Sequence, residues 1–195
     1  MTQLPGNRKA LDNSREQTRF HTVGHSNLDL SDFIALLGKA SIDMVVDVRR
    51  YPGSRAFPQY NQQRLADALR QAGMQYCHLS GLAGRRKKQG MDPDINGAWK
   101  NQSFHNYADY ALGEAFQDDL HKLVRLGKTH QVAIMCAEGV WWRCHRRIIT
   151  DYLLASEHAV NHIIGSSMEP ARLTDFARIG PAGSVTYPVS ASVPD

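Results

Sequence analysis

At 195 residues, with 42% hydrophobic and 22% charged residues, the chain suits one domain with a substantial core, and no apolar run in it is long enough to span a membrane. Its three cysteines have no scaffold-like spacing and no secretory signal precedes them, which predicts a reducing compartment, by default the cytoplasm. The formal net charge of +4 at pH 7 permits an anionic partner such as a nucleotide or nucleic acid, although an ordinary solvated surface has the same charge.

Short apolar runs alternate with helical patterns along the chain. Strands are expected at residues 20–23, 44–48, 76–79, 132–135 and 160–164. Helices are expected after a Ser31 cap, after an Asn61 cap, at 104–112, at 115–126, from about Trp141, and at 170–177. Strands that alternate with helices predict a three-layer α/β fold, a mostly parallel sheet of about five strands with helices on both faces.

The two ends of the chain have a different composition from the middle. Residues 1–19 are polar and aperiodic and are expected to form a disordered N-terminal arm. Residues 180–195 are rich in proline and small residues and are expected to form a flexible C-terminal tail. The single α/β domain is therefore predicted to span residues 20–179.

Reactive side chains gather where the strand at 132–135 runs into the following helix. Cys136 and Glu138 come directly after the strand, and a turn at Gly139 precedes the helix. In open α/β sheets, ligands bind beyond the carboxyl ends of the strands, and a helix N-terminus there favours an anion. Polar residues that follow the other strands are expected to converge on this edge: His25, Ser26, Arg49, Arg50 and His78 or Ser80.

Five motifs occur in one order along the chain: TVGHS at 22–26, VDVR at 46–49, HL at 78–79 with GRR at 84–86, YADY at 107–110, and CAE at 136–138 with CHR at 144–146. Together they resemble the DUF488 family of bacterial proteins of unknown function. The resemblance extends from about residue 20 to residue 164 and implies a single α/β domain. It implies no established activity, substrate or cofactor.

Cys136 is the first candidate for catalysis. A thiol at a strand end, beside a helix N-terminus and several arginines, is expected to have a lowered pKa and to act as a nucleophile. Cysteine phosphatases place an arginine six residues after the cysteine, but here Trp142 occupies that position and Arg143 follows one residue later. The spacing therefore argues against a phosphatase. The competing interpretation is a buried, inert cysteine.

Glu138 is expected to work with His145 or His25 as a general acid/base pair. The competing interpretation is that Glu138 satisfies N–H groups in the first turn of the helix or forms an ion pair with Arg143 or Arg146.

A metal site is an alternative use of the same residues. Cys136, Cys144 and His145, with Glu138 and His25 as further candidates, supply the atoms that zinc or iron prefers. The spacing Cys-x7-Cys-His matches no familiar zinc pattern, and adjacent residues on a helix point about 100° apart. The competing interpretation is that Cys144 and His145 face the sheet as core residues.

Basic and polar residues on the strand-end loops are expected to bind phosphate, since arginine offers bidentate geometry. These substrate-binding candidates are His25, Ser26, Arg49, Arg50, Arg85 and Arg146. A buried network between Asp47 and Arg49 is the structural alternative. The sequence thus predicts an enzyme for a phosphate-bearing substrate, a nucleotide or nucleic acid, with a non-catalytic binding module or a metal-dependent enzyme as alternatives. It indicates no particular cofactor and no protein partner.

Overall fold

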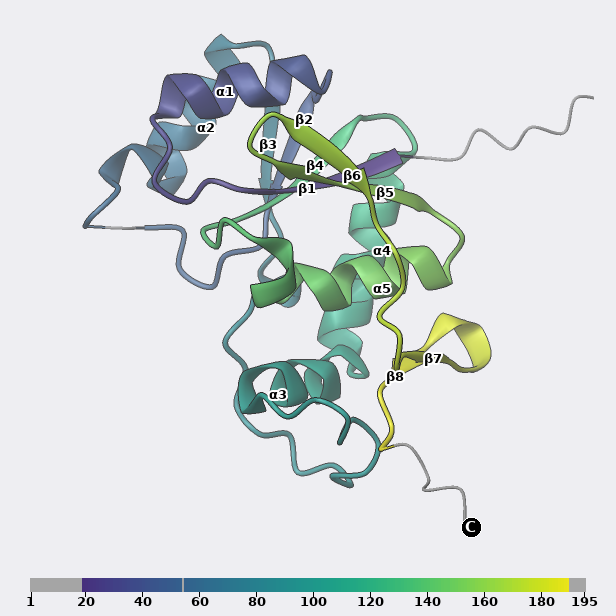
Figure 1. Cartoon of the computed structure of the whole chain (residues 1–195). Coiled ribbons are helices and arrows are strands. Elements are labelled where there is room, and N and C mark those ends of the chain that lie inside the picture. The colour runs from purple at the N-terminus through teal and green to yellow at the C-terminus, as the bar shows by residue number, and fades with distance from the viewer. Residues whose placement is uncertain (1–18, 54, 190–195) are drawn as a thin grey trace, which may run out of the picture.

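The computed structural model describes residues 19–53 and 55–189 (Figure 1). Within them, six strands form one sheet in the order β3-β2-β4-β1-β5-β6. Their bounds are β1 Arg19–Gly24, β2 Met44–Asp47, β3 Gln75–His78, β4 Val132–Cys136, β5 Ala159–Ile164 and β6 Ser167–Pro170. The first five strands pair in parallel, and β6 pairs antiparallel with β5. The predicted mostly parallel α/β fold is confirmed, with β6 as an added edge strand.

The helices of the described residues cover both faces of this sheet. They are α1 Leu30–Lys39, α2 Gln62–Gln71, α3 Gln102–Ala111, α4 Glu114–Gly127 and α5 Arg146–Ala155. Figure 1 shows α1 and α2 on one face and α4 and α5 on the other. Two hydrophobic clusters follow this division: Val45 of β2 packs with α1 and α2, and Val46 packs with α3, α4 and α5. Successive strand residues point to opposite faces, so both faces of β2 are apolar.

The helix expected from about Trp141 begins five residues later. Trp141–Arg143 form only a single 3-10 turn, and Cys144 is extended with φ −123° and ψ 148°. The α-helix α5 begins at Arg146. Cys144 and His145 therefore precede the helix, and the predicted divergence of their side chains is wrong.

Two further local expectations are wrong. The first helix is capped by Asp29 rather than Ser31, because Asp29 is the extended residue before the first turn. The helix expected at 170–177 does not form: Ala171 still donates its backbone N–H to Val160, and Thr174 donates its own to the side chain of Asp151. Long-range partners thus take the backbone donors that a helix would use.

The domain continues into the range expected to be a flexible tail. β7 Arg178–Ile179 pairs with β8 Val185–Thr186, and Val185 and Tyr187 are completely buried. The hydroxyl of Tyr187 donates to Asp151 at 2.8 Å. The chain is therefore packed against the domain at least as far as Tyr187. Residues 190–195 of the expected tail, and residues 1–18 of the expected N-terminal arm, lie outside the described residues.

None of the helices in the described ranges combines the length and apolar character needed to cross a bilayer.

Candidate functional site

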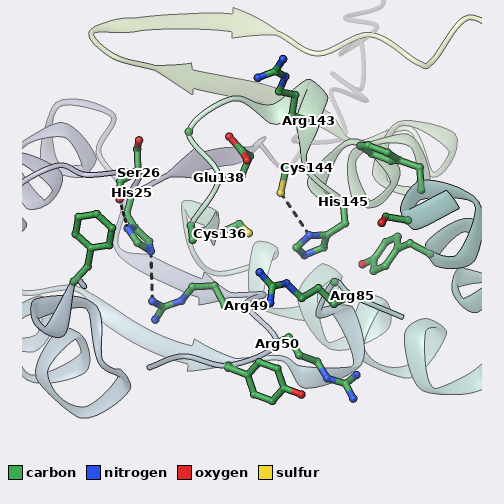
Figure 2. Close-up of a pocket in the computed structure, with 18 of the residues that line it drawn as sticks. His25, Ser26, Arg49, Arg50, Arg85, Cys136, Glu138, Arg143, Cys144 and His145 are labelled. Atoms are coloured by element: carbon green, nitrogen blue, oxygen red, sulfur yellow. Dashed lines mark hydrogen bonds between the residues drawn. The ribbon is translucent and has the colours of Figure 1, made fainter. Parts of the chain in front are cut away.

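A cavity of about 730 Å³ lies at the carboxyl ends of β1, β2 and β4 (Figure 2). These three strands are neighbours in the sheet, with β4 between the other two. Eight of the nine predicted site residues line the cavity: His25, Ser26, Arg49, Arg50, Arg85, Cys136, Glu138 and His145. The ninth, Arg146, lies buried behind the loop that follows β4. His78 and Ser80 do not line it.

The loop after β1 and the loop after β4 run side by side, because the pairing of the two strands continues beyond their ends. His25 donates its backbone N–H to the carbonyl of Cys136, and Ser26 donates to Ala137, both at 3.0 Å. This pairing brings His25 and Cys136 to the same cavity although they are far apart in sequence.

Arg49 is held by Asp47, which is completely buried. The Nε and Nη2 groups of Arg49 donate to both carboxylate oxygens, with the shortest contact at 2.6 Å, and the hydroxyl of Tyr76 donates to the same carboxylate. Nη2 also donates to the carbonyl of Tyr60. The buried network that the sequence offered as an alternative is therefore present, and it engages most of the Arg49 guanidinium.

His25 completes this network. Its Nδ1–H donates to the carbonyl of Ser26 at 3.0 Å, its Nε2 accepts from Arg49 at 3.5 Å, and its ring stacks on Tyr60 with centroids 3.9 Å apart. Burial, followed by the charge of Arg49, lowers the pKa of His25 to about 4. His25 is therefore neutral at pH 7 and presents no positive charge to a substrate.

Cys136, Cys144 and His145 form a compact cluster at the wall of the cavity. Their sulfur atoms and one ring nitrogen all lie within 4.8 Å of one another. His145 Nε2 is 3.0 Å from the carbonyl oxygen of Val48, which can only accept, so Nε2 carries the proton. Nδ1 lies 3.5 Å from the sulfur of Cys144, where it can accept the thiol hydrogen and then, as an N–H group, donate to the thiolate.

The guanidinium of Arg146 lies behind this cluster and is almost fully buried. Its Nε donates to the sulfur of Cys144 at 3.3 Å, and its Nη2 donates to the carbonyl of Glu138 at 2.5 Å. Arg146, the first residue of α5, thus joins the loop after β4 to Cys144, two residues before the helix. In this position Arg146 donates a hydrogen bond to Cys144 and does not line the cavity.

The two thiols of the cluster differ in acidity. Burial opposes ionisation of Cys144, but the hydrogen bond from Cys136, together with His145 and Arg146, holds its pKa well below the usual value. The pKa of Cys136 is raised well above its usual value, first by its hydrogen bond to Cys144 and then by burial. The lowered pKa that the sequence predicted for Cys136 therefore belongs to Cys144.

Charge around the cavity is mainly positive. Arg49, Arg50, Arg85 and Arg143 line it, and Glu138 is its one lining carboxylate among the described residues. Figure 2 shows Arg85 reaching toward the middle of the cavity, whereas Arg50 and Arg143 point away from the two cysteines. Within the described ranges, no hydrogen bond or ion pair engages the Arg85 guanidinium. Arg85 is therefore the cation best placed to meet an anion.

Three features of the site were difficult to predict from the sequence. The carbonyl of Val48 orients His145, and a backbone group leaves no trace in a side-chain pattern. Gly84 packs against the His145 ring, where a Cβ would come within 2.7 Å of Nδ1. The sequence pattern indicates Cys144 only as a metal ligand or a core residue, and the signal that points to a stabilised thiolate is Arg146, two positions later.

A family model described as a domain of unknown function, DUF488, matches residues 29–153. The match includes Arg49, Arg85 and the segment from Cys136 to Arg146, and it begins just after His25 and Ser26. No curated protein and no solved structure matches the chain.

Proposed function

The chain belongs to the DUF488 family, whose function is unknown, and on this premise we propose that it is an enzyme that acts on a phosphate-bearing substrate, a nucleotide or nucleic acid. The observation that carries the proposal is the position of Cys144. Its sulfur accepts a hydrogen bond from Arg146, lies against the ring nitrogen of His145, and borders a cavity lined by arginines. A stabilised thiolate is a nucleophile, and a cavity wall lined by arginines can hold an anionic substrate next to it.

Substrate binding is assigned to the arginines whose charge remains available. Arg85 extends into the cavity, and Arg50 and Arg143 lie exposed at its rim (Figure 2). Arginine donates two parallel hydrogen bonds to a phosphate group, which fixes both its position and its orientation. Arg49 and His25 act instead as positioning residues, because their polar groups already bind one another and Asp47.

The reaction is assigned to the cluster at the cavity wall. Cys144 supplies an electron pair, Cys136 donates its thiol hydrogen to that sulfur, and His145 accepts or returns a proton at Nδ1. Glu138 lines the same cavity and is the candidate general acid or base on the substrate side. Arg146 keeps this loop in place by binding the Glu138 carbonyl.

The proposal is tested by binding and turnover with defined probes. Inorganic phosphate, nucleoside mono-, di- and triphosphates and short oligonucleotides are titrated by calorimetry and followed by ³¹P NMR for conversion. Arg85→Gln is expected to weaken binding about 10- to 100-fold, the effect of one lost charged hydrogen bond. Arg125→Gln, on the exposed last turn of α4, is the matched control and should bind as the wild type does.

Cys144→Ser separates catalysis from binding. It is expected to bind the probe and to abolish conversion, whereas Cys77→Ser, in β3 away from the cavity, should leave both unchanged. Binding without conversion by the wild type would favour the alternative of a non-catalytic nucleotide or nucleic-acid binding module. Absence of binding to every probe would contradict the phosphate-bearing substrate.

A further inference from the structure

We propose that Cys136, Cys144 and His145 form a binding site for a zinc ion, with the fourth coordination position open to the cavity. Two sulfurs and one imidazole nitrogen are the donor types that zinc prefers. The three donor atoms already lie within 4.8 Å of one another in the structure. The inference rests on the proposed function for its substrate cavity and changes the roles of the two thiols: with zinc bound, both sulfurs are deprotonated ligands, and the open coordination position faces the substrate.

The separation of the donors fits tetrahedral coordination. With Zn–S near 2.3 Å and Zn–N near 2.0–2.1 Å, a tetrahedral angle places sulfur and nitrogen about 3.5 Å apart. The sulfur of Cys144 and Nδ1 of His145 are 3.5 Å apart. The ion can therefore enter between these two residues without moving their backbones.

His145 is oriented by a hydrogen bond of the kind that orients metal-binding histidines. A ligating imidazole usually donates its other N–H to a carboxylate or a backbone carbonyl, which fixes the tautomer and the ring plane. Here Nε2 donates to the carbonyl of Val48, so the remaining lone pair at Nδ1 faces the cysteines. This bond joins the residue before α5 to the end of β2.

Charge and access also fit the site. Two thiolates balance the charge of one Zn²⁺, so the neighbouring guanidinium of Arg146 faces a neutral centre and can donate to the Cys144 sulfur. Both cysteines are nearly buried, with 9% and 4% of their surface exposed, and both line the cavity, which provides the entry path. Within the described residues the cluster has three donors, the number typical of a zinc ion that keeps an open position.

The unfamiliar Cys-x7-Cys-His spacing has a structural explanation. Cys136 ends a strand, the loop between the cysteines passes through a single 3-10 turn, and Cys144 and His145 come back to the strand end before α5 begins. The donors are brought together by the strand–loop–helix connection and not by one short metal-binding turn. Spacing along the sequence is therefore a poor guide to this site.

The test uses the full-length chain, reduced, freed of metal by chelator and then dialysed. Zinc is titrated against a chromophoric chelator, and Co²⁺ is added separately as a spectroscopic probe. We expect one equivalent of Zn²⁺ per chain, and with Co²⁺ the intense thiolate-to-cobalt absorption of a site with two cysteines. Lack of stoichiometric Zn²⁺ binding, or a Co²⁺ spectrum without thiolate absorption, would overturn the proposal with no variant needed.

Variants identify the donors. Cys136→Ser, Cys144→Ser and His145→Gln are each expected to weaken Zn²⁺ binding by about 100-fold or more. Cys77→Ser and His121→Gln change the same residue types outside the cluster and should bind Zn²⁺ as the wild type does. Unchanged affinity in the ligand variants would overturn the assignment of the site.

The two proposals fail in different ways. Protein that takes up no stoichiometric Zn²⁺ but converts a phosphate-bearing probe, with the conversion lost in Cys144→Ser, would overturn the zinc site and leave the proposed function standing. Stoichiometric zinc on the three assigned ligands, in a protein that neither binds nor converts any phosphate probe, would support the zinc site and contradict the proposed function.

Discussion

Gly24 lies so close to the main-chain carbonyl of Glu138 that a Cβ on Gly24 would overlap the oxygen and its carbon. The contact occurs where β1 ends and the loop after β4 crosses it, one residue before His25 pairs with Cys136. Only a residue without a side chain allows the two backbones to approach in this way. The close approach of the loop after β4 to the end of β1, where the cavity lies, therefore depends on Gly24.

Gly24→Ala is expected to lower the free energy of unfolding by about 1–3 kcal/mol, since the added methyl group must displace backbone and not a flexible side chain. Gly38→Ala is the matched control: Gly38 lies within α1 with no atom within 4 Å of the added Cβ. That substitution should raise stability by about 0.5–1 kcal/mol. Urea unfolding measures both, and a Gly24→Ala protein as stable as the wild type would contradict the contact.

Gly84→Ala is expected to disturb the cluster more than the fold. Its Cβ would lie 2.7 Å from Nδ1 of His145, so the imidazole must leave its present position in the cluster. We expect Zn²⁺ affinity to fall about 10- to 100-fold, as when the support of a metal-binding histidine is lost. Gly53→Ala, which also lines the cavity but has its nearest neighbour 3.8 Å away, should leave the affinity unchanged.

Asp47→Ala is expected to destabilise the protein by about 3–5 kcal/mol, because it leaves the buried Arg49 charge without its partner. Asp67→Ala provides the comparison, since Asp67 pairs with Arg70 on the exposed face of α2. An exposed pair contributes at most about 1 kcal/mol. Equal losses in the two variants, measured by urea unfolding, would show that Asp47 does not anchor Arg49.

Acid is expected to destabilise the fold through its buried histidines. Burial, with a smaller effect of Arg146, lowers the pKa of His162 to about 4, and His25 is lowered to about 4 as well. Between about pH 6.5 and pH 4 the unfolded chain binds protons at these rings and the folded chain does not. Stability contributed by the neutral rings is therefore complete above pH 6.5 and falls as the pH decreases toward 4.

His162→Gln tests this pH dependence. The glutamine can still bond with Thr22, the partner of His162 Nδ1, but it does not titrate. The free energy of unfolding, measured from pH 7 to pH 5, should decrease less in the variant than in the wild type. A decrease of the same size in both proteins would show that His162 is not one of the groups responsible.

The strands, and the edge of the sheet at which the candidate site lies, were predictable because their signals are local. Short segments of four or five residues, each with several apolar side chains, marked the parallel strands, and polar residues just after them were expected at one edge of the sheet. Which thiol has the lowered pKa was not predictable, because it depends on where α5 begins and on the direction of the Arg146 side chain. The packed segment around Tyr187 was missed for a similar reason, since its partner Asp151 is distant in sequence.

The position of β1 in the sheet also determines when the protein can assemble during synthesis. β1 leaves the ribosome first, but its two neighbours, β4 and β5, are among the last strands to be made. Until then its edges have no partner, and an unpaired apolar strand is prone to join other chains. A translation product cut short before β4 would therefore leave both edges of β1 unpaired, and we expect it to be removed by chaperones and proteases or to aggregate.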